Sequence, residues 1–147
     1  MTESASSLGG VDVSVTDEPA AADLDAVEAG LTAFNTRHIG VADASPMAVF
    51  ARRDGVVVGG ATGRTQWEWL FVKYLWVSDE VRGEGLGAHL LGKAEAAARE
   101  RGCVAVWLDT FSFQAPRFYE RLGYRQFGLL DDFPPGRARH FFWKPLA

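Results

Sequence analysis

The residues best suited to chemistry begin with a glycine-rich turn in the middle of the chain. It reads Arg82-Gly83-Glu84-Gly85-Leu86-Gly87 and lies between an apolar stretch and a helical pattern. The first amides of a helix have no intrahelical partners, and the helix dipole makes that end positive. Glycines let these amides approach a ligand without a Cβ clash, and the Arg82 guanidinium suits phosphate oxygens. The turn therefore predicts a binding site for a pyrophosphate group.

The spacing of the glycines separates this turn from the common nucleotide-binding loops. Glycines alternate at positions 83, 85 and 87, whereas a Rossmann turn requires G-x-G-x-x-G. A Walker loop requires Gly-Lys followed by Ser or Thr, and the sequence holds no such run. Taken alone, the turn is equally compatible with an ordinary helix start.

Strands and helices on both sides must position this turn. Apolar and aromatic residues predict a strand from Trp67 to Val77 before it, and helical spacing predicts a helix from Gly85 to Arg101 after it. A buried strand from Val104 to Leu108 and a short helix from Ala115 to Gly123 follow. The turn thus joins a strand to a helix, the setting in which helix amides can hold an anion.

The remaining patterns complete a mixed α/β order. Asp17 is expected to cap a helix with one buried face, formed by Leu24, Val27, Leu31 and Phe34. Asp54-Gly55 is a strong signal for a hairpin between two strands. The other expected strands span residues 11–15, 47–53, 56–62, 124–130 and 140–144. The order β-α-β-β-β-α-β-α-β-β predicts a mixed β-sheet flanked by helices.

Composition limits the class of protein. The chain has 147 residues, which predicts one domain over residues 11–147, and the small polar residues 1–10 are expected to be a disordered tail. A net charge of −4 argues against a nucleic-acid partner, and the longest apolar run is too short to span a membrane. The single Cys103 excludes an internal disulfide and suits a reducing cytoplasm. Three scattered histidines lack metal-ligand spacing, so no metal is expected.

Two motifs in this region resemble those of the GNAT N-acetyltransferase superfamily. Its central motif, Arg/Gln-x-x-Gly-x-Gly/Ala, is matched by Arg82, Gly85 and Gly87. Its second motif, an alanine followed by an aromatic-Tyr-Glu-Lys/Arg-x-Gly-Phe/Tyr run, is matched from Ala115 to Tyr124. The two motifs lie in the expected order with a strand between them and cover about a third of the chain. The predicted order of elements is also that of the GNAT fold.

The resemblance implies acyl transfer from acetyl-coenzyme A to an amine. The pyrophosphate would lie on the turn, and the pantetheine arm would pair with the backbone of Leu75, Trp76 and Val77 in the preceding strand. A backbone N–H of that strand would steady the tetrahedral oxyanion. Packing in the core is the structural alternative for these side chains, and both roles are compatible.

Tyr119 lies at the position of the family's general acid. A phenol there can donate a proton to the departing sulfur. The structural alternative is a tyrosine that only packs beside Phe118. Many family members also carry an Asn shortly before this helix, and that Asn contacts pantetheine. Counting back from Tyr119 places Ser112 at the Asn position, whereas counting forward from Asp109 places Gln114 at it.

The general base is the least defined role. Some relatives carry a Glu in a Leu-Trp-Leu-Glu context at the end of the strand after the long helix, where this chain has Val106-Trp107-Leu108-Asp109. Others carry a Glu on the strand that here holds Glu68, so Asp109 and Glu68 are the two candidate bases. Water, His38 or an acceptor that arrives neutral are the alternatives.

The resulting expectation is a cytoplasmic acetyl-coenzyme A-dependent N-acetyltransferase that acts on a primary amine of a small molecule or peptide. The alternative is a binding module of the same fold that holds coenzyme A and transfers little. Another nucleotide-phosphate binder would leave the tyrosine motif unexplained. The sequence leaves the acceptor and the oligomeric state open, with a homodimer among the alternatives.

Overall fold

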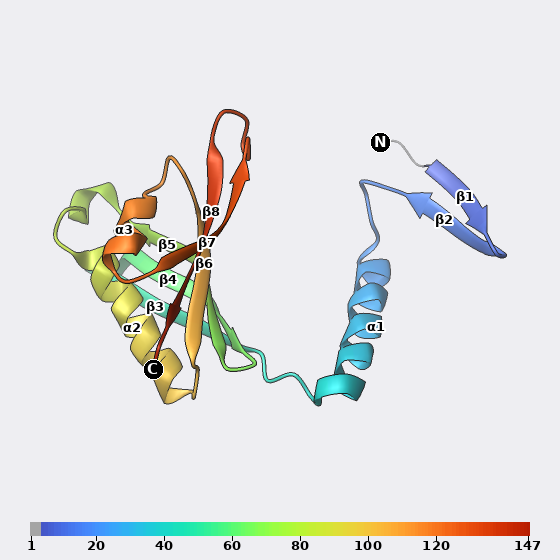
Figure 1. Ribbon diagram of the computed structural model, residues 1–147, viewed down its shortest axis with the longest axis horizontal. Helices are drawn as coiled ribbons and strands as arrows, with labels where there is room; N and C mark the ends of the chain where they lie inside the picture. The colour runs from blue at the N-terminus through green and yellow to red at the C-terminus, as the bar shows by residue number, and fades with distance from the viewer. Residues whose placement is uncertain (1–3) are drawn as a thin grey trace. The chain divides into compact units, whose positions relative to one another are not determined.

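The computed structural model describes residues 4–147 and divides into two compact units, Met1–Ala42 and Asp43–Ala147. The single domain expected over residues 11–147 stays a prediction. The first unit holds strands β1 (Ser4–Leu8) and β2 (Val11–Val15) and helix α1 (Ala21–Ile39). Figure 1 shows the elements of each unit.

A β-hairpin replaces most of the expected disordered tail. Strands β1 and β2 pair antiparallel, from Ser4 opposite Val15 to Leu8 opposite Val11. Gly9 and Gly10 join them with φ angles of 57° and 80°, which glycine adopts without a Cβ penalty. Residues 1–3 of the expected tail lie outside the described residues.

Helix α1 differs from its prediction at its start and along its apolar face. Its N-cap is Ala20, without a side-chain cap, so Asp17 does not cap the helix. None of its described residues is buried, and the expected buried face is exposed, with Val27 at 74%. The physical reason within this unit is that one hairpin is too little structure to enclose a helix face. Gly40 ends the helix as expected, with its N–H bonded to Thr36 O.

The second unit is built on a six-stranded mixed sheet of order β3-β4-β5-β6-β8-β7. Its strands are β3 (Ser45–Arg53), β4 (Val56–Gln66), β5 (Trp69–Val77), β6 (Ala105–Phe111), β7 (Arg125–Asp131) and β8 (Ala138–Pro145). All neighbours are antiparallel except β5 and β6. The turn Asp54-Gly55 joins β3 to β4, as the hairpin signal predicted.

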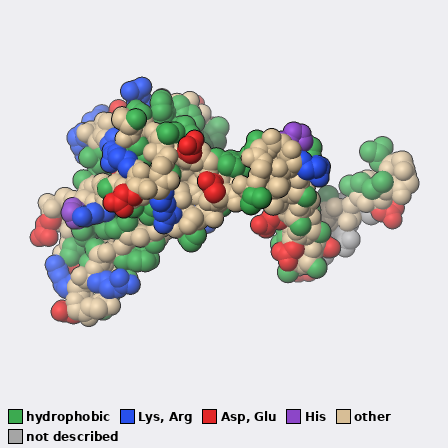
Figure 2. Space-filling view, turned by 90° about the horizontal axis from the view of Figure 1, so that it is seen from below, with side chains coloured by type: hydrophobic (Ala, Val, Ile, Leu, Met, Phe, Trp, Pro, Cys, Tyr) green, Lys and Arg blue, Asp and Glu red, His purple; other side chains and the backbone are tan. Residues whose placement is uncertain are grey.

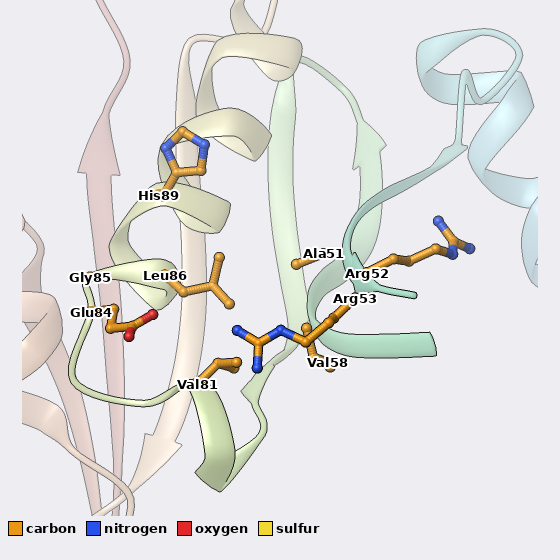
Figure 3. Close-up of a pocket in the computed structure, with 9 residues that line it drawn as sticks. All are labelled: Ala51, Arg52, Arg53, Val58, Val81, Glu84, Gly85, Leu86 and His89. Carbon is orange, nitrogen blue, oxygen red and sulfur yellow. The ribbon is translucent and has the colours of Figure 1, made fainter. Parts of the chain in front are cut away.

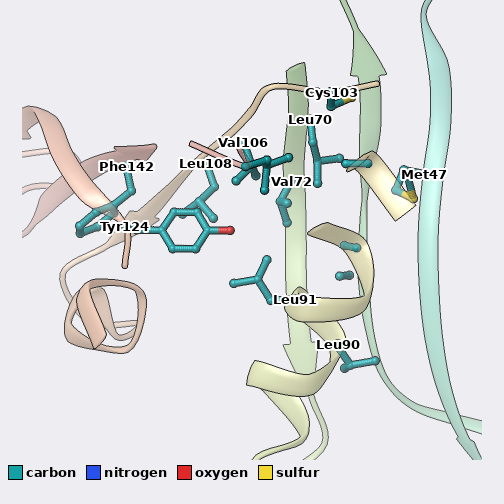
Figure 4. Packing of buried hydrophobic residues seen from close by; sticks show 14 residues of the cluster. Met47, Leu70, Val72, Leu90, Leu91, Cys103, Val106, Leu108, Tyr124 and Phe142 are labelled. Atoms are coloured by element: carbon teal, nitrogen blue, oxygen red, sulfur yellow. The ribbon is translucent and has the colours of Figure 1, made fainter. Parts of the chain in front are cut away.

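Helix α2 (Leu86–Glu100) covers one face of this sheet, and the core lies between them (Figure 4). Its buried residues include Leu90, Leu91 and Ala94, which pack with Phe142 and other sheet residues. A short 3₁₀ helix η1 (Asp79–Val81) precedes the glycine turn, and helix α3 (Pro116–Arg121) follows β6. The core therefore fixes α2 and, with it, the position of the glycine turn.

A buried polar cluster ties α2 to the end of the sheet. The Tyr124 hydroxyl donates to Glu95 Oε2 at 2.6 Å, and Lys144 Nζ donates to Glu95 Oε1 at 3.1 Å. Burial raises the pKa of Tyr124 above its ordinary value, and its hydrogen bond to Glu95 adds to the effect. The cluster satisfies a carboxylate that would otherwise be costly to bury.

Candidate active site

The glycine turn presents open backbone at the start of α2. Gly85 is the N-cap of the helix, with φ at 79°, and Gly83 has φ at 83°. A Cβ built on either residue would meet nothing within 4 Å. A ligand can therefore approach the amides at this end of α2, as pyrophosphate binding requires.

Arg82 lies at the mouth of this turn and is exposed. Its Nε donates to Val77 O at 3.1 Å, and its Nη1 lies 3.1 Å from Asp79 Oδ1. An ion pair this exposed is weak, so the guanidinium can exchange Asp79 for a phosphate oxygen at little cost.

The two parallel strands part beside the turn and open a cleft. Strands β5 and β6 pair from Trp69 opposite Ala105 to Val72 opposite Leu108. Beyond that pair β5 runs on to Val77 and β6 to Phe111, unpaired with each other. The cleft between them measures about 950 Å³. It is lined by residues of both strands, by Arg82, Gly83, Gly85, Leu86 and Gly87 of the turn, and by Gln114, Phe118 and Tyr119.

The β5 side of the cleft has a free strand edge. Leu75, Trp76 and Val77 line the cleft and pair through their other edge with Ala61, Gly60 and Gly59 of β4. No strand of the described chain covers the edge that faces β6 past Val72. An extended amide chain could add to this edge as a further strand would.

A β-bulge lies where the cleft begins. Thr62 pairs with Tyr74 and Gly63 with Val72, so Lys73 is an extra residue on β5. Bulges bend a strand and leave one residue out of the ladder. This bend explains why β5 turns away from β6 directly after Val72.

Tyr119 lines the cleft from α3 and packs among aromatic rings. Its ring lies 5.1 Å from Phe118, 5.8 Å from Tyr124 and 5.9 Å from Phe142. Burial, with the Asp109 charge adding to it, raises the pKa of Tyr119 to about 12. The phenol therefore keeps its proton at neutral pH and can act as a donor.

Asp109 follows Leu108, the last residue of β6 that pairs with β5, and it lines the same cleft. Its Oδ1 accepts from Arg139 Nε at 2.9 Å and lies 2.8 Å from Arg139 Nη2. Both contacts fall on Oδ1 of the carboxylate.

The two candidates for the pantetheine contact are separated by the structure. Gln114 lines the cleft, and its Oε1 accepts from Thr110 Oγ1 at 3.0 Å and from Phe111 N at 2.7 Å. Ser112 pairs with β8 instead, where its Oγ accepts from Ala138 N at 3.1 Å. Ser112 is not among the residues that line the cleft.

Glu68 lies at the far end of β5 from the turn. It forms a two-residue turn with Trp67 between β4 and β5, with φ angles of 65° and 52°. Five strand residues at about 3.3 Å each separate it from Lys73 by roughly 16 Å. The structure therefore does not bring Glu68 together with Asp109 and Tyr119.

A second hollow of about 520 Å³ lies on the other side of the glycine turn (Figure 3). It shares Gly85 and Leu86 with the first cleft and reaches Arg53 and His89. Neither Tyr119 nor Asp109 lines it. The predicted catalytic residues Tyr119 and Asp109 line the cleft between β5 and β6 instead.

Cys103 belongs to the core and not to the cleft. Its side chain is buried, and burial raises the pKa of its thiol. A covalent intermediate on this residue would need an exposed thiolate.

Three further features concern partners and cofactors. Over residues 4–147, no group of three or more His, Cys, Asp or Glu could hold a metal ion. No helix of the described chain is long and apolar enough to cross a membrane. On the face of the second unit in Figure 2, basic and acidic side chains are interspersed.

Comparison with known proteins identifies the family. The sequence matches the Acetyltransferase (GNAT) family over residues 16–124. It is 44% identical over 115 residues to the Blasticidin-S acetyltransferase of Streptomyces morookaense, covering 75% of this chain and 85% of that protein. It is 36% identical over 114 residues to Acetyltransferase Atu2258 of Agrobacterium fabrum, covering 77% and 83%. A crystal structure of an acetyltransferase from Bacillus cereus ATCC 14579 matches with a TM-score of 0.81 at 32% identity, covering 89% and 96%.

The chain therefore belongs to the GNAT family of acetyltransferases. It is an acetyl-coenzyme A-dependent N-acetyltransferase, and the fold class predicted from its sequence is confirmed. The open amides at Gly83 and Gly85 fit the pyrophosphate of this donor.

Proposed function

We propose that this enzyme acetylates a primary amine of a small molecule by direct attack within the cleft between β5 and β6. One observation carries the proposal: the open glycine turn, Tyr119 and Asp109 all line that one cleft. A small acceptor is favoured over a peptide because a relative with 44% identity is a Blasticidin-S acetyltransferase. A cytoplasmic location is proposed with it, since the only thiol is buried and free. A homodimer stays a prediction.

The donor would lie along the cleft from the turn toward Asp109. Amides near Gly83 and Gly85, with Arg82, would hold the pyrophosphate. Leu86 and Gly87 line the same cleft, whereas Glu84 lines the hollow on the other side of the turn. The free edge of β5 from Leu75 to Val77 would pair with pantetheine amides. Gln114 is the proposed side-chain contact rather than Ser112, because only Gln114 lines the cleft.

The transfer needs one group that takes the amine proton and another that stabilises the departing thiolate. The amine nitrogen attacks the thioester carbon, and the Asp109 carboxylate accepts the amine proton directly or through one water. The C–S bond then breaks, and the Tyr119 hydroxyl donates a hydrogen bond to the departing thiolate. A phenol with a pKa of about 12 is a weaker acid than a thiol near 8.5, so complete transfer would be unfavourable by about 5 kcal/mol. Tyr119 therefore acts chiefly by stabilising the thiolate through that bond.

Donor binding is tested at the turn. Gly85→Val should weaken acetyl-coenzyme A binding by well over tenfold, because the new side chain fills the open space that the phosphates need. Isothermal titration measures the dissociation constant. Gly55→Val is the matched control, since Gly55 also has a φ of 79° and a Cβ built there would meet nothing within 4 Å. Equal affinities of the two variants would contradict the assignment of the turn.

The base is tested by the pH dependence of the rate. Asp109→Asn should lower kcat/KM about tenfold at low pH and less at high pH, where the free amine forms unaided. Glu68→Gln should keep the wild-type profile, because Glu68 lies at the other end of β5. A shift in Glu68→Gln alone would reverse the two assignments. Wild-type profiles in both variants would leave proton removal to water or to the acceptor's own low pKa.

The alternative of a binding module is separated by one measurement. Release of free thiol from acetyl-coenzyme A in the presence of a panel of amines reports transfer. Tight donor binding without amine-dependent thiol release would support the binding module.

A further inference from the structure

Three aromatic rings lie near Asp109, and one of them, Phe113, lines the cleft. We define the aromatic wall as Phe111, Phe113 and Phe133. The rings of Phe111 and Phe113 are parallel with centroids 5.5 Å apart, and Phe133 lies 6.0 Å from Phe111. The wall therefore joins the end of β6 to two loops that meet there.

The wall is fixed to the carboxylate through Arg139. The guanidinium carbon lies 5.4 Å from the Phe111 centroid and 5.1 Å from that of Phe133, while the same group pairs with Asp109. Register places Arg139 directly opposite Phe111 in the β6–β8 pair. One side chain thus sets the distance between the rings and the proposed base.

Phe113 and Phe133 are partly open to solvent, and the exposed Arg137 guanidinium lies over Phe113, with its carbon 5.8 Å from the ring centroid. Phe113 is 56% exposed and Phe133 is 44% exposed. Across the cleft, Tyr74 and Trp76 of β5 are 64% and 51% exposed, and both line the cleft together with Phe113 and Asp109. Large apolar groups gathered around one cleft mark a binding surface.

We propose that the acceptor is a primary amine carried on a planar aromatic or heteroaromatic ring, which stacks on Phe113 of the aromatic wall with its amino group toward Asp109. The inference rests on the proposed function, because it places the ring beside the group that would take the amine proton. A flat ring in the cleft can meet Phe113 face to face at an offset when the exposed Arg137 side chain swings aside, whereas an aliphatic chain gains only apolar contact. The second side of such a ring would meet Tyr74 or Trp76.

Two amines of matched shape test the ring preference. Benzylamine and cyclohexylmethylamine have similar size but differ in the planarity of the ring and in the basicity of the amine, so kcat/KM is compared per concentration of free amine. The wild-type enzyme should prefer benzylamine in kcat/KM by about fivefold to tenfold, the range that ring stacking supplies. Phe113→Leu keeps an apolar side chain and removes the ring face, so the preference should fall to within about twofold. Phe50→Leu is the control, because Phe50 is a similarly exposed ring on β3 away from the cleft.

A binding measurement keeps this inference separate from the proposed function. Ligand-observed NMR on protein saturated with coenzyme A gives dissociation constants of both amines without transfer. If neither amine is acetylated but a benzylamine preference is present and is lost in Phe113→Leu, the ring site stands and the proposed function fails. If both amines are acetylated and Phe113→Leu does not reduce any preference for benzylamine, the ring site is overturned and the function stands. Absence of a preference in both kinetics and binding also overturns the ring site.

Discussion

Replacement of Tyr119 by Phe should lower kcat by about 10²-fold while the dissociation constant of acetyl-coenzyme A hardly changes. The substitution removes one hydroxyl and keeps the ring that packs against Phe118 and Phe142. Within residues 4–147 that hydroxyl has no hydrogen-bond partner, so its loss should cost little stability. The interaction expected to be lost is the proposed hydrogen bond to the thiolate, which would form only as the C–S bond breaks. Steady-state kinetics and isothermal titration measure the two quantities.

Tyr124→Phe provides the opposite pattern. Tyr124 lies 5.8 Å from Tyr119 but donates to the buried Glu95, so its substitution should lower stability by about 1–3 kcal/mol and leave kcat near wild type. The pH profile adds an independent readout. Because the pKa of Tyr119 is raised to about 12, its hydroxyl stays protonated through pH 10, and kcat should show no alkaline fall from this group below about pH 11. Equal kcat values in wild type and Tyr119→Phe would assign Tyr119 to packing alone.

Local patterns were sufficient for most elements of the second unit. The apolar spacing in α2 placed Leu90 and Ala94 in the core, and Asp54-Gly55 placed the first hairpin. The turn at Trp67-Glu68 escaped prediction because both residues adopt positive φ angles that bulky side chains rarely take. The continuous strand expected from Trp67 therefore begins at Trp69, and this change alone moves Glu68 out of the strand.

The acceptor side of the site depends on long-range register that no local pattern contains. Arg139 follows a Pro-Pro-Gly turn and gives no signal by itself. Arg139 lies opposite Phe111 in the β6–β8 pair, and this pairing brings the Arg139 guanidinium to Asp109, which is 30 residues away in the sequence. Arg139 and Phe141 are two residues apart on β8, so the sequence indicates that they share a face of the sheet. The identity of the neighbouring strand, β6, depends on the order of strands in the whole sheet. The glycine turn was predictable for the opposite reason, since its six residues are consecutive.

Gly63→Val should destabilise the second unit by at least about 3 kcal/mol, the upper part of the range for overpacking. A Cβ at Gly63 would meet the carbonyl oxygen of Phe71, with the Phe71 carbonyl carbon at 2.9 Å and Val72 Cα at 3.1 Å. These are backbone atoms and cannot swing aside as a side chain would. Gly63 lies opposite Val72 beside the bulge at Lys73, so any relief must move β5 where it parts from β6. Chemical denaturation measures the loss of stability.

The same displacement should also reach the donor site. Val72 and Leu108 form the last pair before the cleft, so a shift of β5 there changes the edge on which pantetheine is proposed to lie. Gly63→Ala, the milder variant, should therefore bind acetyl-coenzyme A more weakly even where it remains folded. Gly92→Ala is the control for a glycine substitution. A Cβ built on Gly92 of α2 would meet nothing within 4 Å, so the variant should gain about 0.5–1 kcal/mol in stability and keep its affinity for acetyl-coenzyme A. If Gly63→Ala matched Gly92→Ala in both stability and affinity for acetyl-coenzyme A, the idea that the close approach of β4 to the bulge shapes the cleft would be wrong.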